Sequence, residues 1–428
     1  MKELFKQTVT SIISFEARIL LWRKRPSIIA ITGNVGKTST KDAIYTVITK
    51  KVRVRKSQKS YNSDIGVALT ILGLQNAWSN PFRWMINIVE GMAIALFSRS
   101  YPEWLVLEMG VDRPGDMKRL TRWIKPDIVV LTRFPEIPVH VEYFSSPEAV
   151  IKEKMELVHA LKEDGIVVYN HDDERINLAL EEVRQQAIGF SRYSRSQFVA
   201  QRDSVVYTDG LPSGMKFTIN HGNESIGIDV VGALGAQYTY SHTAAVAVGT
   251  LLGVTLEDAR IALLEHVPAP GRMRIIEGKK GTVLLDDTYN AAPVAVEQSL
   301  MSLSEIKLVR RRIAVLGDML ELGKYSAREH ERLGLFAATH ADILITVGVR
   351  ARSMAQFALS AGMSEKNIAQ FDDSLKAGKE LEAGIQPGDV ILVKGSQSMR
   401  MERVVKELMA HPEHAEELLV RQEEMWKN

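Results

Sequence analysis

The first residues of the chain have apolar side chains at the spacing of an amphipathic helix. Within residues 2–22 the apolar positions near helical spacing include Phe5, Val9, Ile12, Ile13, Ala17, Leu20 and Leu21. They recur every three or four positions and would share one face of a helix. The next residues are Arg23-Lys-Arg-Pro26, and proline ends a helix because it has no amide hydrogen to donate. We therefore predict that residues 1–26 form an N-terminal amphipathic helix.

A second apolar stretch covers residues 84–97. It is shorter than the roughly 20 apolar residues that a membrane-spanning helix requires, and Asn87 and Glu90 interrupt it. We expect no transmembrane segment. This stretch and the N-terminal helix either cover the core of the adjoining domain, which we favour, or make a peripheral contact with a membrane surface.

Farther along, short apolar runs alternate with helical stretches. Residues 27–31 are typical of a strand, a glycine-rich turn follows, and helical spacing resumes after Lys37. Strand-like runs also lie at 104–107, 127–131 and 165–169, helical stretches at 147–162, 239–252 and 256–265, and a β-rich, antiparallel patch at 198–231. Strands alternating with helices predict an α/β fold with a mostly parallel sheet.

A proline- and glycine-rich segment, Val267-Pro-Ala-Pro-Gly271, interrupts this alternation. Such a segment between two periodic regions is typical of a linker. Strand-like runs then resume, each followed by a helical stretch, at 282–286, 312–316, 342–347 and 389–393. We predict a central α/β domain over 27–268 and a Rossmann-like α/β domain over 269–428.

Composition narrows the class of protein. The chain has 428 residues, 45% of them hydrophobic and 25% charged, which excludes disordered, fibrous and integral-membrane proteins. The formal net charge of +2 gives no reason to expect a nucleic-acid partner. Cysteine is absent, so disulfides and thiolate chemistry are excluded. We expect a cytoplasmic monomer that acts on a small-molecule or peptide substrate.

The glycine-rich turn after residues 27–31 has the features of a phosphate-binding loop. Its backbone amides can surround phosphate oxygens at the start of a helix, where the helix dipole also favours an anion. The lysine can reach the β- and γ-phosphates, and the threonine hydroxyl can bind Mg²⁺. The alternative is a tight turn with a chance Gly-Lys-Thr sequence, because residue 31 is isoleucine where the usual loop has glycine. The candidate residues are Gly33, Asn34, Val35, Gly36, Lys37, Thr38 and Ser39.

The phosphate-binding loop indicates candidate functions for several other polar residues. Glu108 ends an apolar run and can hold the metal of a phosphate-binding loop, although carboxylates at strand ends are common. His140 lies in a loop, and Lys154 lies on a charged helix where local ion pairs would explain it. In the second half, Arg272 at the linker can reach a transferring phosphate, and Asp287 at a strand end can hold a ribose hydroxyl. The alternative for Arg272 is a salt bridge at the linker, and the alternative for Asp287 is a helix N-cap.

Taken together, ordered motifs make the chain resemble the Mur ligase family of cell-wall precursor synthesis over about residues 30–428. The motifs are Thr-Gly-Asn-Val-Gly-Lys-Thr at 32–38, Tyr-Asn-Ser-Asp-Ile-Gly at 61–66, Glu-Met-Gly at 108–110, His140 followed by Lys154-Met-Glu156, Gly-Arg at 271–272, Asp-Asp-Thr-Tyr-Asn-Ala-Ala-Pro at 286–293, Leu-Gly-Asp-Met-Leu-Glu-Leu-Gly at 316–323 with His330, and Lys-Gly-Ser at 394–396.

The resemblance implies that residues 27–268 are a central, P-loop-containing ATPase domain. It also implies an ATP- and Mg²⁺-dependent ligase that joins a carboxylate to an amine through an acyl phosphate, adding D-alanyl-D-alanine or a related amine to a cell-wall peptide. It implies catalytic roles for Lys37, Lys154, His140 and Arg272. Nucleotide binding would involve residues 33–39 with Arg272, Asp287 and Asn290. The implied metal ligands are Thr38, Glu108, His140 and Lys154 as a carbamate. The implied substrate contacts are Asn62, Asp64, Lys394, Ser396 and Arg400.

The chain departs from the family pattern in several places. Complete relatives place a UDP-binding domain before the phosphate loop, whereas here that loop begins near residue 32. Ala292 stands where the family has asparagine, and Gln397 stands where it has arginine, with Arg400 nearby as a substitute. Two alternatives therefore stay open: a ligase for a lipid-linked or other non-UDP acceptor, and a non-catalytic nucleotide-binding protein.

Overall fold

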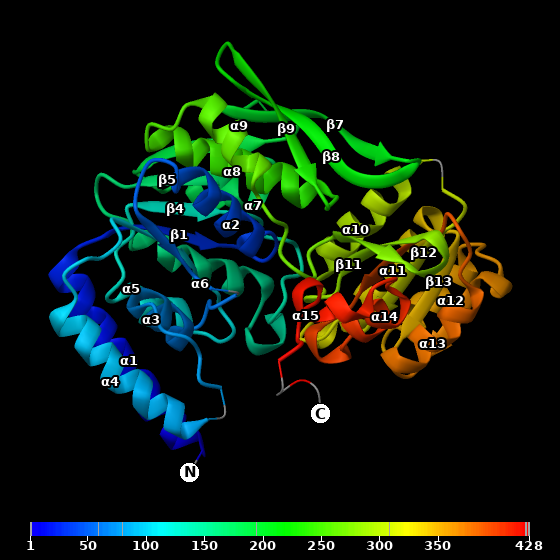
Figure 1. The fold of residues 1–428 in the computed structure, drawn as a ribbon, viewed down its shortest axis with the longest axis horizontal. Coiled ribbons are helices and arrows are strands. Elements are labelled where there is room, and N and C mark those ends of the chain that lie inside the picture. Colours follow the sequence, from blue (N-terminus) through cyan, green and yellow to red (C-terminus); the bar gives the residue numbers. More distant parts are fainter. Residues whose placement is uncertain are drawn as a thin grey trace.

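The computed structural model describes residues 2–58, 60–78, 80–193, 195–307, 309–423 and Trp426. Two sheets organise them (Figure 1). The strands of the first sheet are β1 (Ser27–Thr32), β2 (Val54–Lys56), β3 (Trp104–Glu108), β4 (Ile128–Leu131), β5 (Ile166–Asn170), β6 (Gln186–Ser191), β7 (Phe198–Thr208), β8 (Leu211–His221) and β9 (Glu224–Val231).

The first sheet has the strand order β2-β3-β1-β4-β5-β6-β7-β8-β9. Its strands are parallel from β2 to β7, whereas β7, β8 and β9 pair in antiparallel fashion. The predicted antiparallel patch is therefore the continuation of the large sheet. The helices of this half are α1 (Lys2–Lys24), α2 (Lys37–Ile48), α3 (Asp64–Leu72), α4 (Pro81–Phe97), α5 (Asp116–Thr121), α6 (Pro147–His159), α7 (Glu174–Leu180), α8 (Ala236–Leu251) and α9 (Leu256–Leu264).

Helices cover both faces of the parallel part of this sheet. Strand β1 shows why, because its alternate residues enter two different cores: Ile29 and Ile31 pack with α2 and α8, while Ile28 and Ala30 pack with α1, α3 and α6. A parallel strand that is buried on both faces reads as a continuous apolar run. The predicted α/β class with a mostly parallel sheet is confirmed.

The second sheet has the order β10-β11-β15-β12-β13-β14. All its pairs are parallel except β10 with β11. The elements of this half are β10 (Arg274–Gly278), β11 (Thr282–Asp287), α10 (Pro293–Glu305), β12 (Arg312–Gly317), α11 (Ser326–His340), β13 (Ile343–Val347), α12 (Arg352–Ser360), β14 (Ile368–Phe371), α13 (Ser374–Gly384), β15 (Val390–Lys394), α14 (Glu402–Leu408) and α15 (Ala415–Leu418). The periodicity predicted four of these strands and missed the two edge strands, β10 and β14.

The two apolar stretches near the N-terminus form a helix pair. The inner face of α1 is buried through Val9, Ile13, Ala17 and Leu20, and α4 buries Trp84 and Ala95 in the same core. The role of covering the domain core is thus confirmed for one face of each helix. In the part of the chain that the structure describes, no helix is long and apolar enough to cross a membrane.

Candidate active site

The phosphate-binding loop connects β1 to α2 through two glycines with positive φ angles. Gly33 has a φ of 143° and Gly36 a φ of 84°. A side chain at Gly33 would place its Cβ 2.0 Å from the Thr132 hydroxyl oxygen, so only glycine fits there. The loop therefore ends at the N-terminus of α2, where free amides and the helix dipole favour an anion.

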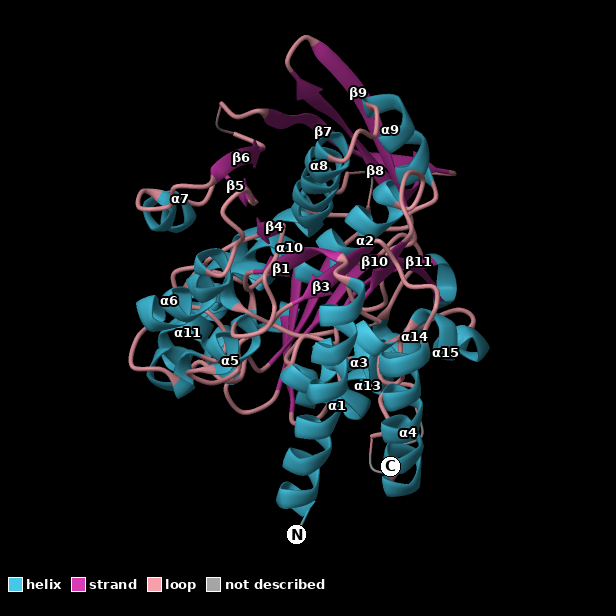
Figure 2. Ribbon diagram, turned by 90° about the vertical axis from the view of Figure 1, so that its left-hand side faces the viewer, coloured by secondary structure: helices cyan, strands magenta, loops and turns pink. Residues whose placement is uncertain are grey.

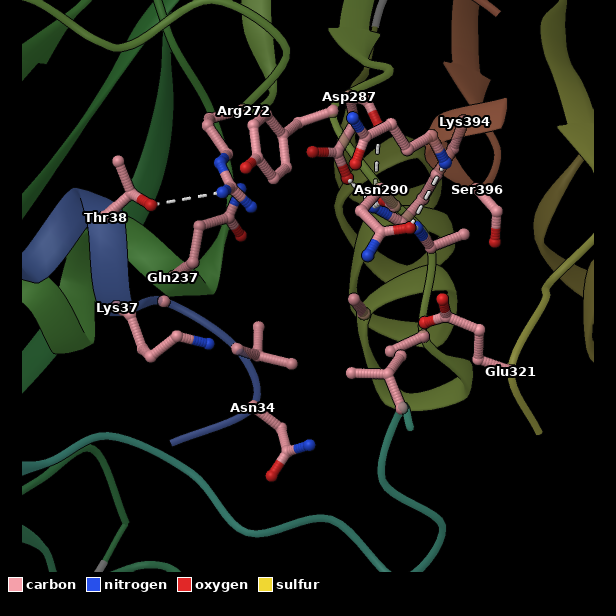
Figure 3. A pocket seen from close by; sticks show the side chains of 18 of the residues that line it. Asn34, Lys37, Thr38, Gln237, Arg272, Asp287, Asn290, Glu321, Lys394 and Ser396 are labelled. Carbon is pink, nitrogen blue, oxygen red and sulfur yellow. Dashed lines mark hydrogen bonds and ion pairs between the residues drawn. The ribbon is translucent and has the colours of Figure 1, made fainter. Parts of the chain in front are cut away.

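Thr38, in the first turn of α2, contacts residues from both halves of the molecule. Its hydroxyl donates to Glu108 Oε2 at 2.9 Å and lies 3.0 Å from Ser60 Oγ. Arg272 Nη2 donates to the same hydroxyl at 3.1 Å, across the boundary between the two halves of the molecule (Figure 3). Glu108 reaches the loop because β3 pairs with β1 in parallel, with Ile31 opposite Glu108.

The donor set around Thr38 fits Mg²⁺. Thr38 and Glu108 offer a hydroxyl and a carboxylate oxygen 2.9 Å apart, and Asn62 approaches the other Glu108 oxygen at 3.5 Å. Mg²⁺ prefers oxygen ligands and usually keeps several waters and substrate phosphates in its shell. Among the described residues no cluster of three histidine, aspartate or glutamate side chains is close enough to hold a metal without such additional ligands.

Two lysines point at the carbonyl of Gly33. Lys37 Nζ donates to it at 2.9 Å and Lys154 Nζ, from α6, at 3.2 Å. Burial lowers the pKa of both amines, and the charge of Lys37 contributes to lowering the pKa of Lys154 to about 7. Lys154, which helical patterning alone assigns to a solvated face, is in fact 2% exposed.

His140 faces the second half of the molecule. Its Nδ1 lies 2.7 Å from Glu321 Oε2, and its Nε2 lies 3.4 Å from Asp112 Oδ1. Hydrogen bonding to His140 lowers the pKa of Glu321. His140 and Glu321 both have positive φ angles, 67° and 62°. In this structure His140 therefore contacts Glu321 across the boundary between the two halves of the molecule.

Residues of the second sheet form the opposite wall. Asp287 Oδ2 accepts from Lys394 Nζ at 2.6 Å and from Ser299 Oγ at 2.7 Å. Lys394 also donates to the Asn290 carbonyl oxygen at 3.0 Å. The Arg272 guanidinium lies 3.9 Å from the centre of the Tyr289 ring, which holds it over the cleft.

The cavity between these walls has a volume of about 490 Å³. Figure 3 shows Lys37 and Asn34 on one side of it and Asp287, Asn290, Lys394 and Glu321 on the other. The predicted site residues that line it are Asn34, Val35, Gly36, Lys37, Thr38, Ser39, Asn62, Glu108, His140, Arg272, Asp287, Asn290, Lys394 and Ser396.

Four predicted residues lie outside the lining. Gly33 and Lys154 sit just behind the loop and meet each other there. Asp64 instead accepts from Arg119 at 3.0 Å. Arg400 instead pairs with Glu402 at 2.5 Å. The substrate roles of Asp64 and Arg400 stay predictions, and this geometry gives them no contact with the cavity.

Sequence reasoning missed several lining residues. Asp112, Gln237, Tyr289, Gln298, Glu321 and Trp426 all border the cavity. Glu321 and Tyr289 lie inside conspicuous motifs, so a motif signal was available for them. His330, in the same motif region as Glu321, is buried and accepts from the Met319 amide at 3.0 Å, so it positions that loop without lining the cavity.

Comparisons with known proteins agree with this architecture. The family model of the Mur ligase middle domain matches residues 87–249, and that of the Mur ligase, glutamate ligase domain matches residues 271–397. The chain is 28% identical over 389 residues to the UDP-N-acetylmuramoyl-tripeptide–D-alanyl-D-alanine ligase of Bacillus subtilis, covering 90% of this chain and 76% of that protein. For the same-named protein of Escherichia coli the identity is 27%, with coverage of 89% and 76%.

A solved structure shows the same fold. The crystal structure of MurF ligase from Thermotoga maritima in complex with ADP superimposes with a TM-score of 0.74 at 24% identity, covering 93% of this chain and 83% of that one. The two family models together span about two thirds of the sequence, and each matches one of the two sheet-containing halves that border the cavity. The chain belongs to the Mur ligase family.

Proposed function

We propose that this protein is an ATP- and Mg²⁺-dependent ligase that joins a carboxylate to an amine, adding D-alanyl-D-alanine or a related amine to a cell-wall peptide precursor. The observation that carries the proposal is the cavity itself. A phosphate loop with Lys37 and Thr38 forms one wall, and Arg272, Asp287 and Asn290 form the other. The names of the curated relatives support the choice of substrates.

In the proposed reaction an oxygen of the acceptor carboxylate attacks the γ-phosphorus of ATP, and the bond to ADP breaks. The resulting acyl phosphate is attacked by the incoming amine, which loses a proton, and inorganic phosphate leaves. Lys37 and Arg272 face the transferring phosphoryl group from two sides, and positioned cations of this kind stabilise the charge that develops there. Closing both walls around the acyl phosphate would keep water from hydrolysing it.

Thr38 and Glu108 would hold Mg²⁺, with Asn62 orienting the Glu108 carboxylate. The ion would neutralise charge on the phosphate oxygens. His140 Nδ1 lies 2.7 Å from Glu321 Oε2, so its proposed role as a metal ligand through this nitrogen requires the contact to open.

The finer part of the proposal is that Lys154 works as a carbamate. A protonated lysine cannot ligate a metal, but an amine whose pKa is about 7 is partly neutral at physiological pH. The neutral nitrogen can attack CO₂, forming an N–C bond and releasing a proton. The carbamate would replace like-charge repulsion from Lys37 with attraction and would supply oxygen ligands.

Exchange of Lys154 tests the carbamate. We expect Lys154→Ala to lose activity by about 100-fold or more, in the range of removing one charge-stabilising group, and to recover part of it when a short carboxylic acid is added. Unmodified Lys154 in the mass spectrum together with full activity in carbonate-free buffer would refute the carbamate and leave the ligase proposal standing.

Phosphate release from ATP, screened over acceptors and amines, tests the ligase itself. Lys37→Ala should reduce turnover by about 100- to 1,000-fold with little change in thermal stability. Lys50→Ala is the matched control, because Lys50 forms an exposed ion pair with Glu265. Comparing UDP-linked with lipid-linked acceptors distinguishes the two ligase alternatives. ATP binding without phosphate release under any combination of acceptor and amine would support a non-catalytic nucleotide-binding protein.

A further inference from the structure

The helix pair α1–α4 carries a large exposed apolar surface that the cavity does not use. Figure 2 shows α1 and α4 extending beyond the rest of the molecule, and Figure 1 shows them side by side. We call this surface the α1–α4 apolar face. Its exposed members are Phe5, Phe15, Trp22, Phe82, Met85, Val89, Leu96 and Phe97.

The spacing of these residues shows that they form stripes. On α4 the exposed positions 82, 85, 89 and 96 recur at three-, four- and seven-residue intervals, so they share one helix face. The opposite face of α4 buries Trp84, Asn87 and Gly91. Apart from Arg83 and Glu90, which lie 3.6 Å apart, α4 has no charged residue.

The stripes of the two helices lie on the same side of the pair. Helices α1 and α4 run parallel, since Glu16 lies beside Gly91 and, farther along, Arg23 donates to the Ala95 carbonyl. On α1, Phe15, the half-buried Ile19 and Trp22 recur at four- and three-residue intervals, next to Glu16 and Arg23 on the helix surface. Combining these positions by helical geometry gives one continuous apolar surface.

Positive charge surrounds this surface. Segments 1–26 and 81–99 contain eight basic and three acidic residues, a formal net charge of +5, although the whole chain carries only +2. By helical position Arg18 and Arg23 lie on either side of the stripe on α1. At the C-terminal ends of both helices, Lys24 Nζ donates to the Arg99 carbonyl oxygen at 3.0 Å, which brings Arg99 to this group.

We propose that the α1–α4 apolar face docks on the surface of an anionic lipid bilayer. Aromatic and aliphatic side chains enter the boundary between headgroups and acyl chains, while flanking lysines and arginines bind lipid phosphates. Charge argues against a second copy of this chain as the occupant, because self-association would bring two clusters of net charge +5 together. The proposal does not depend on the ligase reaction.

Vesicle flotation tests the proposal with the full chain. We expect binding to phosphatidylcholine vesicles that contain phosphatidylglycerol, at least about tenfold weaker binding to phosphatidylcholine alone, and weakening by salt. The variant Trp22→Ser/Val89→Ser/Phe97→Ser, whose parent residues are 73%, 70% and 75% exposed, should lose at least about tenfold in affinity.

The matched control is Leu178→Ser/Val231→Ser/Val349→Ser, whose parent residues are 65%, 67% and 73% exposed outside this face. It should bind like the wild type. If the first variant does not fold, tryptophan fluorescence is measured with brominated lipids instead. These lipids should quench the fluorescence of the wild type and not that of Trp22→Phe. The proposal is overturned if wild type does not bind anionic vesicles, if the control loses as much, or if the face instead mediates self-association or binds only a protein partner.

Discussion

At the scale of single residues, Asp287 and Lys394 form an ion pair of 2.6 Å whose side chains are only 9% and 3% exposed. Removing one partner of a buried pair leaves the other charge without compensation, which costs about 3–5 kcal/mol. We expect Asp287→Ala to lower the free energy of unfolding by that amount, measured by urea denaturation. The pair also fixes the cavity wall, because Lys394 holds the Asn290 carbonyl.

An exposed pair provides the control. Arg352 and Asp372 lie 2.7 Å apart with side chains 56% and 69% exposed, and surface ion pairs contribute about 0–1 kcal/mol. Asp372→Ala should therefore change stability little. Equal losses in Asp287→Ala and Asp372→Ala would show that burial does not determine the strength of the first pair.

At the scale of elements, the packing of α1 on α4 encloses the Glu16 carboxyl. Neither of its oxygens has a hydrogen-bond partner among the described residues, and burial raises the pKa of Glu16 to about 7 from the usual 4.5. The folded state thus holds a proton that the unfolded state releases between pH 4.5 and 7. Stability from this group is complete below pH 4.5 and is lost as the pH rises to about 7.

Glu16→Gln should remove this pH dependence. The free energy of unfolding of the variant minus that of the wild type should be higher at pH 8 than at pH 5. The difference should be about 1–3 kcal/mol, the order expected for a pKa shift of this size. Glu90→Gln on the neighbouring helix is the control, since the Glu90 side chain is 44% exposed. A difference between variant and wild type that is the same at both pH values would contradict a buried, protonated Glu16.

At the scale of the whole molecule, the two halves meet at the cavity through few polar contacts. Arg272 donates to Thr38, and His140 pairs with Glu321. The linker includes Gly271, whose φ is 69°, and hinges are typically a few residues between elements. Arg272 already contacts Thr38, whereas Asp287 and Asn290 lie across the cavity from the phosphate loop (Figure 3). We predict that the second half swings about residues 268–271 to bring this wall onto the same nucleotide.

Small-angle scattering measures this motion. A non-hydrolysable ATP analogue with Mg²⁺ and acceptor should reduce the radius of gyration of the wild type. Lys37→Ala, which binds the phosphates weakly, should show a smaller change at the same ligand concentration. A radius of gyration that stays constant under saturating ligand would indicate a fixed interface between the halves.

Local patterning along the chain was enough to predict most of the elements and the phosphate loop, because burial periodicity and glycine-dependent turns are local properties. It missed the edge strands β10 and β14. The sequence also placed Lys37 and Thr38 at the start of a helix and Glu108 at the end of a strand. These positions lie at the edge of the sheet where the carboxyl ends of parallel strands meet. Which distant groups meet could be seen only in the folded chain: Arg272 contacts Thr38, His140 contacts Glu321, and Lys154 contacts the loop carbonyl. These contacts depend on sheet register and on the docking of two halves.

The dependence on tertiary contacts also explains why two predicted substrate residues, Asp64 and Arg400, do not line the cavity. It explains as well why the sequence could not show which apolar side chains of α1 and α4 are exposed. Whether Arg400 points into the cavity or toward Glu402 depends on neighbours that its own motif does not contain. Apolar spacing predicted α1 and α4 as helices, but which of their apolar faces is covered depends on where each packs. A sequence pattern records that a residue is apolar, whereas its exposure is set by every element that the fold brings against it.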